Sequence, residues 1–512
     1  MVGRTPKTKK GRRGQRGGEP FAVSEPTRRA LAEAFGVVDP RPIQSAAIPK
    51  ALAGLDVFAK AATGSGKTLA FLVPVVERLA AGGPAPVGGA IRAIVLSPAR
   101  ELAQQTHDVA TRLLAFHAGL GAQLVIGGTN KSAEERALAS QPCDVLVATP
   151  GRLVDHMEVA AFAARLAAVQ VLVLDEADRM LDAGFRMSLE RIAAVLPPTR
   201  QNLFFTATVP DAVKEVARRV MRAGYVSIDV TDGEDAPINP QIAQSYVVAP
   251  ADQVFPALRA LLAAKVAERP DHRIIVFFPT TKLVEFASAL FRALGMSILE
   301  VHGRLSQPQR TRYTDDFRAN AGRVLFASDV AARGVDFPDV TLVLQVGLTD
   351  ATTYEHRTGR TGRAGKSGEA VILLAHEESP LLRELRPMPA STAFVPPFAP
   401  LAPIADAKLA REAEAAFVGQ LGFLAAQLGR MRWTKEALVE LDRALFRGAG
   451  MAGQPTVAPK LLKKMHLDGV PGLAAAPAVA APAPAPVAAP AVAGPAPVAA
   501  PALQFASKTQ IM

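Results

Sequence analysis

Short apolar runs alternate with longer amphipathic stretches over the first 230 residues of the chain. The runs are nearly continuous in Val, Ile, Leu and Phe, which predicts parallel strands buried on both faces of a sheet. The stretches 100–114 and 188–196 between them have helical spacing. This alternation predicts a doubly wound α/β lobe over residues 21–230. Its expected strands are 57–61, 93–97, 124–126, 144–149, 171–175 and 203–206.

The pattern breaks once and then resumes. Residues 231–243 are polar and rich in turn formers, which indicates a linker, and a second α/β lobe is expected over 244–376. Beyond that lobe the β signal stops, a proline-rich patch follows, and 406–446 has a helical pattern. We therefore predict an α-helical appendage over 377–473. The expected strands of the second lobe are 274–278, 298–301, 324–328, 342–346 and 370–374.

Charge is concentrated outside the two lobes. The chain of 512 residues has 58 Lys and Arg against 47 Asp and Glu, a net charge of +11. Residues 1–18 hold seven bases and no acid, and residues 430–464 hold eight bases and three acids. Such terminal clusters are typical of proteins that bind a polyanion such as nucleic acid, and a tail that only aids solubility is the alternative. The single cysteine, Cys143, excludes an internal disulfide and disfavours a thiolate metal site.

Both ends of the chain are predicted to be disordered tails. Residues 474–512 are mainly Ala and Pro, and their prolines break any helix that could span a membrane, so we expect no membrane partner. Residues 1–20 are basic and lack the apolar core of a secretory signal. An intracellular protein is expected. A mitochondrial or other organellar address is one interpretation of the basic segment, and the nucleus and the cytoplasm are the others.

The segment AATGSGKT, residues 61–68, has the form of a phosphate-binding loop. It follows a predicted strand and opens a predicted helix, so its backbone N–H groups can surround phosphate oxygens. Lys67 can reach the β- and γ-phosphates, and Thr68 can coordinate Mg²⁺. The candidate nucleotide-binding residues of this loop are Thr63, Gly64, Ser65, Gly66, Lys67 and Thr68.

Two acids at the end of another predicted strand supply the second half of a nucleotide site. Asp175 stands where the apolar run 171–175 ends, a position from which it can hold Mg²⁺ through water. Glu176 lies beside it and can activate the attacking water. Together with the phosphate-binding loop, these acids predict ATP and Mg²⁺ as ligands, with Lys67 as a third catalytic candidate.

The tetrad Asp-Glu-Ala-Asp at 175–178 resembles the signature of the DEAD-box RNA helicases, and further motifs follow in that family's order over about 21–374. GVVDPRPIQ, residues 36–44, with Phe21 before it, resembles the family's adenine-reading motif, although Arg41 stands where the family usually has Thr. The resemblance implies two tandem RecA-like lobes, ATP as the substrate, RNA as the partner, and nucleotide contacts from Phe21 and Gln44.

The remaining motifs resemble the family's RNA-binding and lobe-coupling elements. In the first lobe they are SPAREL (97–102), Gly127-Gly128, TPGR (149–152) and TAT (206–208); in the second, HGRLSQPQR (302–310), ASDVAARGVD (327–336) and HRTGRTGR (356–363). The resemblance implies RNA contacts from Arg100, Gly128, Thr149, Arg152, Gly303 and Ser328. It implies coupling of the lobes by Asp178, Thr206, Thr208 and His356. It also implies that Asp336 contacts ribose and that Arg360 and Arg363 complete the ATP site when the lobes close.

The appendage has a likeness of its own. LGFL at 421–424, the basic stretch through Arg447 and residues 459–473 resemble the carboxy-terminal extension of a subgroup that includes fungal mitochondrial RNA chaperones and plant organellar relatives. That likeness implies an additional RNA-binding surface, and a helical brace packed on the second lobe is the alternative. Trp433 either stacks a base or anchors a core.

The combined prediction is an RNA-dependent ATPase that acts as a monomer. It unwinds or remodels RNA duplexes and RNA–protein complexes locally when ATP drives the two lobes to close on the RNA backbone, with weak sequence preference. An ATP-gated RNA clamp that serves as an assembly platform is the alternative. A DNA helicase is disfavoured by the likeness to the adenine-reading motif and by the complete tetrad at 175–178.

Overall fold

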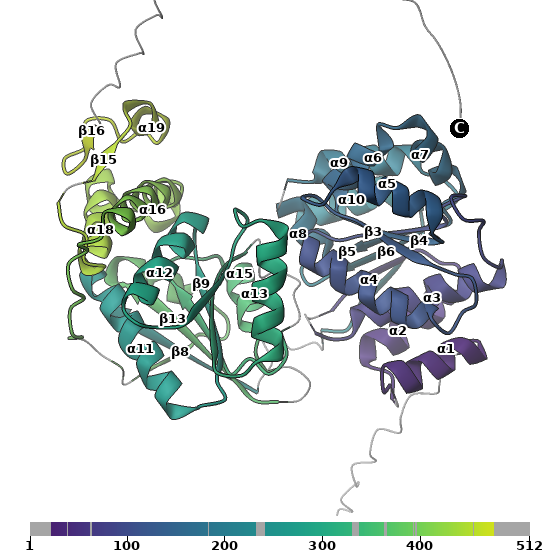
Figure 1. The fold of residues 1–512 in the computed structure, drawn as a ribbon, viewed down its shortest axis with the longest axis horizontal. Coiled ribbons are helices and arrows are strands. Elements are labelled where there is room, and N and C mark those ends of the chain that lie inside the picture. The colour runs from purple at the N-terminus through teal and green to yellow at the C-terminus, as the bar shows by residue number, and fades with distance from the viewer. Residues whose placement is uncertain are drawn as a thin grey trace, which may run out of the picture.

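The chain folds into two lobes that lie side by side, each built on a parallel sheet of seven strands (Figure 1). The computed structural model describes residues 22–37, 39–61, 64–182, 184–231, 241–329, 337–362, 366–392, 394, 397–453 and 455–475. The predicted tandem parallel-sheet architecture is therefore confirmed. The predicted basic segment 1–20, most of the linker and nearly all of the Ala/Pro tail lie outside the described residues.

The sheet of lobe 1 has the strand order β3-β4-β2-β5-β6-β1-β7. Helices cover both of its faces (Figure 1), and two separate apolar clusters lie between helices and sheet. The strands are β1 (Val57–Lys60), β2 (Ala93–Leu96), β3 (Ala122–Val125), β4 (Val145–Ala148), β5 (Val171–Asp175), β6 (Gln201–Thr206) and β7 (Val226–Asp229). The helices are α1 (Glu25–Arg29), the π-helix η1 (Ala30–Ala34), α2 (Pro42–Leu52), α3 (Lys67–Ala81), α4 (Arg100–Leu114), α5 (Lys131–Ser140), α6 (Pro150–Met157), α7 (Ala160–Arg165), η2 (Leu166–Ala168), α8 (Ala177–Asp182), α9 (Arg186–Val195) and α10 (Asp211–Val220).

The register of the central strands gathers the sequence motifs at one edge of this sheet. Lys60 of β1 is paired with Thr206 of β6, and Asp175 of β5 is paired with Phe205 of β6. The strands are parallel, so their carboxyl ends meet at the same edge. The phosphate-binding loop after β1, the acids after β5 and the TAT segment after β6 consequently lie together, as ligand sites do in open α/β sheets.

Lobe 2 repeats this plan with the strand order β10-β11-β9-β12-β13-β8-β14. Its strands are β8 (Ile242–Ala249), β9 (Arg273–Phe278), β10 (Ile298–Val301), β11 (Arg323–Ser328), β12 (Leu342–Val346), β13 (Gly368–Ala375) and β14 (Ala390–Ser391). Its helices are η3 (Ala251–Gln253), α11 (Val254–Glu268), α12 (Thr281–Ala293), α13 (Gln307–Ala319), α15 (Ala351–Thr358) and the 3-10 helix η4 (His376–Arg383). Helix α13 lies on the side of lobe 2 that faces lobe 1 (Figure 1).

The remaining residues form an extension that packs on lobe 2. It contains α16 (Ala407–Ala425), α17 (Leu428–Met431), α18 (Lys435–Gly448) and α19 (Pro459–Lys464), with a small sheet of β15 (Thr456–Val457) and β16 (Ala474–Ala475). Phe446 of α18 stacks on Phe286 of α12 with ring centroids 5.6 Å apart, and Phe417 of α16 meets the Phe446 ring edge-on. The extension and one face of lobe 2 therefore share a single apolar core.

Three boundaries predicted from the sequence were wrong in detail. Strand β8 begins at Ile242, so the linker ends before residue 243. The segment from 377 onward is not purely helical, because η4 is a 3-10 helix and β14 pairs with β8 in the lobe 2 sheet. Residues Ala474 and Ala475 form β16 and so do not belong to a disordered tail. Within the described residues, no helix is long and apolar enough to cross a membrane.

Candidate active site

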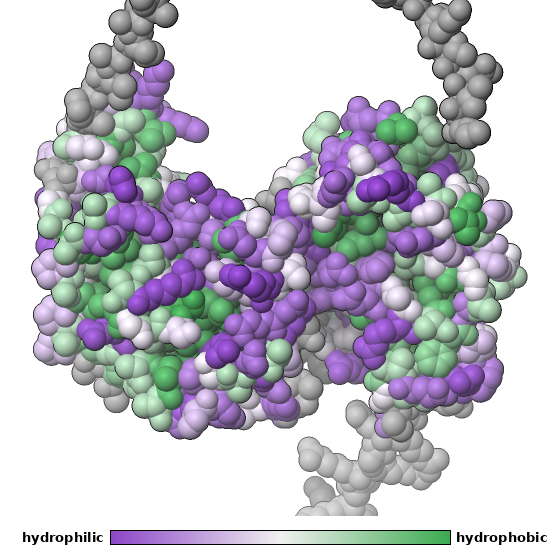
Figure 2. Space-filling view, in the orientation of Figure 1, coloured by the Kyte–Doolittle hydropathy of each residue, from purple (hydrophilic) through white to green (hydrophobic). Residues whose placement is uncertain are grey.

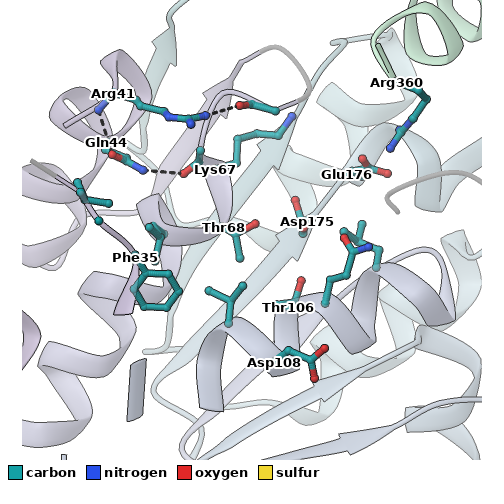
Figure 3. A pocket seen from close by; sticks show the side chains of 18 of the residues that line it. Phe35, Arg41, Gln44, Lys67, Thr68, Thr106, Asp108, Asp175, Glu176 and Arg360 are labelled. Carbon is teal, nitrogen blue, oxygen red and sulfur yellow. Dashed lines mark hydrogen bonds between the residues drawn. The ribbon is translucent and has the colours of Figure 1, made fainter. Parts of the chain in front are cut away.

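A pocket of about 850 Å³ lies where the two lobes meet (Figure 3). Lobe 1 supplies most of its lining, including Lys67, Thr68, Asp175 and Glu176. Lobe 2 contributes Arg360. The pocket thus brings together, from two separate sheets, the charged groups that the sequence assigned to ATP.

The phosphate-binding loop is shaped by its glycines. Gly64 and Gly66 have φ values of 77° and 98°, in the left-handed region that favours glycine. A Cβ on Gly66 would lie 2.7 Å from the side-chain nitrogen of Gln44, so a larger residue would have to displace Gln44 as well as adopt a strained φ. The buried Ser65 hydroxyl has no hydrogen-bond partner among the described residues. A cradle closed to Cβ atoms with an unpaired hydroxyl fits a phosphate group.

Gln44 and Arg41 hold this loop from the adjacent helix α2. The Gln44 side chain accepts a hydrogen bond from the Arg41 backbone N–H at 3.0 Å and donates one to the Gly66 carbonyl at 3.2 Å (Figure 3). The Arg41 guanidinium donates to the Gly64 carbonyl at 2.5 Å. The departure from the family pattern at Arg41 therefore adds a second bond to the loop. Thr63 and Phe21 lie outside the described residues.

Helix α3 begins at Lys67, which places the lysine at the floor of the pocket. Its ammonium group donates to the Ala61 carbonyl at 2.8 Å. Asp175 is buried at the end of β5, and burial raises the pKa of its carboxyl to about 7, with the charge of Glu176 adding to the rise and Lys67 opposing it. A buried acid next to a second acid is suited to a divalent cation, which would offset both charges. Thr68 and Asp175 line the same pocket and fit Mg²⁺ as ligands.

The DEAD tetrad also contacts lobe 2. Asp178 accepts hydrogen bonds from the Thr208 backbone N–H at 3.0 Å and from its hydroxyl at 2.6 Å, and the Asp178 N–H donates to the Thr206 hydroxyl at 3.4 Å. From lobe 2, the His356 ring nitrogen lies 3.8 Å from the same carboxylate. The four residues assigned to lobe coupling are thus in one cluster. Of the other lobe 2 candidates, Asp336 and Arg363 lie outside the described residues.

A second contact between the lobes joins α4 to α13. Arg310 of α13 forms a salt bridge of 2.6 Å with Glu101 of α4, and the two side chains are 4% and 7% exposed. Beside it, Arg100 of α4 donates to the Gln307 side chain of α13 at 3.4 Å. Glu101, Gln307 and Arg310 were inside recognised motifs but were not among the predicted functional residues. A sequence pattern does not show that two segments 200 residues apart face each other.

The predicted RNA-binding residues lie outside the lining of the nucleotide pocket. Thr149 precedes α6 and its hydroxyl accepts a hydrogen bond from the Gly127 N–H at 3.4 Å. Arg152 is bound to Glu134 at 2.8 Å and to the Thr129 carbonyl at 2.5 Å, so its guanidinium holds the glycine loop in place. Gly303 is exposed after β10, whereas Ser328 is buried at the end of β11.

These candidates follow the carboxyl ends of strands, and Figure 2 shows a hollow between the two lobes with a largely hydrophilic wall on the lobe 2 side. Such a polar wall is compatible with contacts to a sugar–phosphate backbone.

Two further pocket residues were missed by sequence reasoning. Phe35 lines the pocket beside Gly36, and the Arg112 guanidinium lies 4.5 Å from the centre of its ring. Arg318, at the end of α13, lines the pocket from lobe 2. Phe35 immediately precedes the recognised motif and was detectable as an aromatic residue. Arg318 had no sequence signal, because only the approach of the two lobes brings it to the pocket.

Two RecA-like lobes, a phosphate-binding loop, paired acids and an arginine from the opposite lobe define a bilobal nucleotide hydrolase. The DEAD/DEAH box helicase family matches residues 41–216, and the helicase conserved C-terminal domain matches residues 253–365. The chain belongs to the DEAD-box ATP-dependent RNA helicases, and it is an ATP-hydrolysing RNA helicase.

Named relatives span most of the chain. DEAD-box ATP-dependent RNA helicase 26 of Oryza sativa subsp. japonica is 42% identical over 84% of this chain and 81% of its own length. DEAD-box ATP-dependent RNA helicase 25 of Arabidopsis thaliana is 37% identical over 89% of this chain and 83% of its own. Among solved structures, the DEAD-box helicase Mss116 bound to ssRNA and UDP-BeF is similar, with a TM-score of 0.77 and 26% identity, covering 88% of this chain and 94% of its own.

We expect Gly128→Ala to impair the response to RNA. Gly128 has a φ of 86°, and a Cβ there would overlap the Arg100 guanidinium, which would then be pushed away from Gln307. RNA-stimulated ATPase should fall about tenfold, because backbone strain and a displaced side chain cost about 1–2 kcal/mol. Binding of a fluorescent ADP analogue should stay unchanged.

Gly127→Ala is the matched control for this variant. A Cβ on Gly127 would lie 3.5 Å from Arg100, an ordinary contact, so its ATPase should stay within about twofold of the wild type. Equal losses in the two variants would contradict the role given to the Arg100 position.

Proposed function

We propose that this helicase remodels RNA locally by closing its two lobes on the RNA backbone while ATP is bound between them. The observation that carries the proposal is that the two lobes meet beside the pocket through polar contacts. The lobe 2 residues of the pocket, Arg318 and Arg360, are brought to it by this interface. The buried Glu101–Arg310 salt bridge and the His356–Asp178 contact lie at that boundary. Polar contacts of this kind can form and break repeatedly, as a cycle of closure requires.

The catalytic roles follow from the pocket. Lys67 and the loop N–H groups bind the β- and γ-phosphates, and Glu176 orients the attacking water and takes its proton. Arg360, with Arg363 three residues later in the sequence, stabilises charge on the transferred phosphoryl group, because a guanidinium stays charged and donates in a fork. Thr68 and Asp175 would hold Mg²⁺, which neutralises phosphate charge. Hydrolysis then depends on closure, since lobe 1 lacks these arginines.

RNA binding is coupled to closure through the start of α4, which contacts lobe 2. Arg100 carries a predicted RNA contact and its neighbour Glu101 carries the salt bridge to lobe 2, so one helix end serves both surfaces. RNA that spans the hollow would favour the closed state and thereby hydrolysis. Contacts to phosphate and sugar imply weak sequence preference. The ssRNA named in the Mss116 structure supports RNA as the ligand of this surface.

RNA stimulation of ATP hydrolysis tests the proposed function. Turnover should rise at least about tenfold with single-stranded RNA and much less with DNA of the same sequence, and a short RNA duplex should be separated when ATP is present. Glu176→Gln should lower hydrolysis by about 100-fold or more, because a general base contributes 10²–10⁴-fold. An ATPase rate indifferent to RNA would refute the proposal. RNA stimulation without strand separation would favour the clamp.

Closure has its own test in the Glu101–Arg310 pair. Arg310→Glu places two carboxylates together in a buried site, which should lower RNA-stimulated turnover about 100-fold, the equivalent of about 3 kcal/mol. The double variant Glu101→Arg, Arg310→Glu should recover most of the loss.

Arg312→Glu, on an exposed position of the same helix, provides the control for helix charge and should remain near wild type. If the double variant is as inactive as Arg310→Glu, the salt bridge does not act through attraction between the lobes.

The extension contributes a basic surface to the proposed RNA grip. Lys460, Lys463 and Lys464 of α19 are exposed, on a part of the extension that projects from lobe 2 (Figure 1). The Mss116 structure covers 88% of this chain, whereas the Dbp5 structure from S. cerevisiae, with a TM-score of 0.64 and 26% identity, covers 73% of this chain and 95% of its own. The greater coverage supports the likeness to the subgroup with a carboxy-terminal extension.

Replacing these three lysines with alanine should weaken RNA binding and flatten its salt dependence. Each lysine–phosphate interaction removed from a single strand lowers the slope of log K against log salt by about 0.7, so a change of about 2 is expected in titrations with labelled RNA. Deleting the extension is a poorer test, since it uncovers the apolar face of α12.

Removing three exposed lysines outside α19, namely Lys50 and Lys214 of lobe 1 and Lys408 at the start of α16, controls for net charge. If the α19 variant binds RNA with the wild-type slope, the extension is only a brace.

A further inference from the structure

One arginine of the basic extension is turned toward lobe 2. Arg430 lies in α17, and its guanidinium donates to the Thr349 carbonyl at 2.9 Å and to Glu384 at 2.6 and 3.2 Å. Its side chain is 28% exposed. Close by, the Trp433 indole N–H donates to the Glu377 carbonyl at 3.2 Å. The N–H groups of Arg430 and Trp433 that could bind an RNA phosphate or base are thus bound to lobe 2.

The Thr349 carbonyl stands at the entrance to α15. The next residue, Asp350, caps that helix by accepting hydrogen bonds from the Thr353 backbone N–H at 2.8 Å and from the Thr353 hydroxyl at 2.6 Å. A helix is oriented by the residues that fix its first turn. Arg430 therefore fixes the position of the Thr349 carbonyl just before α15, and the Glu384 carboxylate fixes the Arg430 guanidinium.

Helix α15 is the element of lobe 2 that reaches the DEAD tetrad. Arg179 of lobe 1 donates to the Thr352 carbonyl at 3.4 Å, and His356 lies 3.8 Å from Asp178. Beyond the helix end, the Nε of Arg360 donates to the His356 carbonyl at 3.3 Å, and Arg360 lines the nucleotide pocket. The carbonyl held by Arg430 and the carbonyl held by lobe 1 are therefore close together along the chain.

We infer that Arg430 is a positioning residue for ATP hydrolysis: through the Thr349 carbonyl it sets the placement of α15, and with it His356 and Arg360. The extension then acts on turnover in the closed state as well as on the RNA grip. This inference rests on the proposed lobe closure. Arg430 then serves ATP hydrolysis, whereas the lysines of α19 serve RNA binding.

The geometry of the guanidinium distinguishes a positioning role for Arg430 from simple electrostatic attraction to RNA. Arg430 reaches a carboxylate and a carbonyl simultaneously, and a lysine at this position keeps the charge but presents one compact ammonium group. A phosphate contact would survive Arg430→Lys, because Coulomb attraction to RNA depends mainly on charge. Positioning of Thr349 would not survive it.

The experiment compares Arg430→Lys and Arg430→Ala with Arg411→Lys and Arg411→Ala in the full chain. Arg411 is an exposed base of the same extension, in α16. At saturating ATP and RNA, both Arg430 variants should lower kcat about tenfold, a typical coupling between sites, with unchanged KM for RNA. The Arg411 variants should keep the wild-type kcat. Thermal melting of Arg430→Lys near that of the wild type excludes a folding defect.

A double-mutant cycle with His356→Ala tests the route. If Arg430 acts through α15, adding Arg430→Lys to His356→Ala should lower kcat by much less than tenfold. A full tenfold further loss would overturn the route through His356, and a wild-type kcat or a raised KM for RNA in Arg430→Lys would overturn the inference. A wild-type enzyme without RNA-stimulated hydrolysis would refute the proposed function, whereas normal stimulation with an unaffected Arg430→Lys refutes only this inference.

Discussion

The nucleotide pocket is completed where the two lobes meet, because its acids and Arg360 lie on opposite sides of that boundary. Asp175 and Glu176 follow a strand of the first sheet, and Arg360 follows a helix on the second. Lobe 1 alone therefore lacks the lobe 2 arginine that would stabilise developing charge on a phosphoryl group in the proposed mechanism. The Glu101–Arg310 salt bridge joins the two lobes, and the cap of α15 fixes the helix that precedes Arg360.

The central strands were predictable from the sequence because they are buried on both faces. β5 and β12 were placed at their observed bounds for that reason. β7 was missed because its side chains alternate between half-buried and exposed at the sheet edge, which leaves no continuous apolar run. β8 was missed for a similar reason, and its first residues were assigned to the linker. The missing strands are those in which burial depends on neighbours that the sequence does not show.

The chemistry of the pocket was predictable wherever adjacent residues act together, as in the phosphate-binding loop. It was not predictable where the partners are distant along the chain. Arg310 reaches Glu101 only because α13 lies against α4, and Arg318 reaches the pocket by the same approach of the lobes. Arg152 illustrates the converse. Its motif predicts an RNA contact, and in the structure its guanidinium binds Glu134 and the Thr129 carbonyl, next to the glycine loop.

Net charge is therefore a poor measure of how much surface the chain offers to RNA. Within the extension, Arg430 directs its charge into lobe 2, while the lysines of α19 remain exposed. A brace and an RNA-binding surface were posed as alternatives, but the contacts of Trp433 and Phe446 and the exposure of α19 fit both roles in one domain. An extension that shares the lobe 2 core moves with that lobe. In the proposed cycle, RNA held on α19 would therefore be carried along as lobe 2 closes on lobe 1.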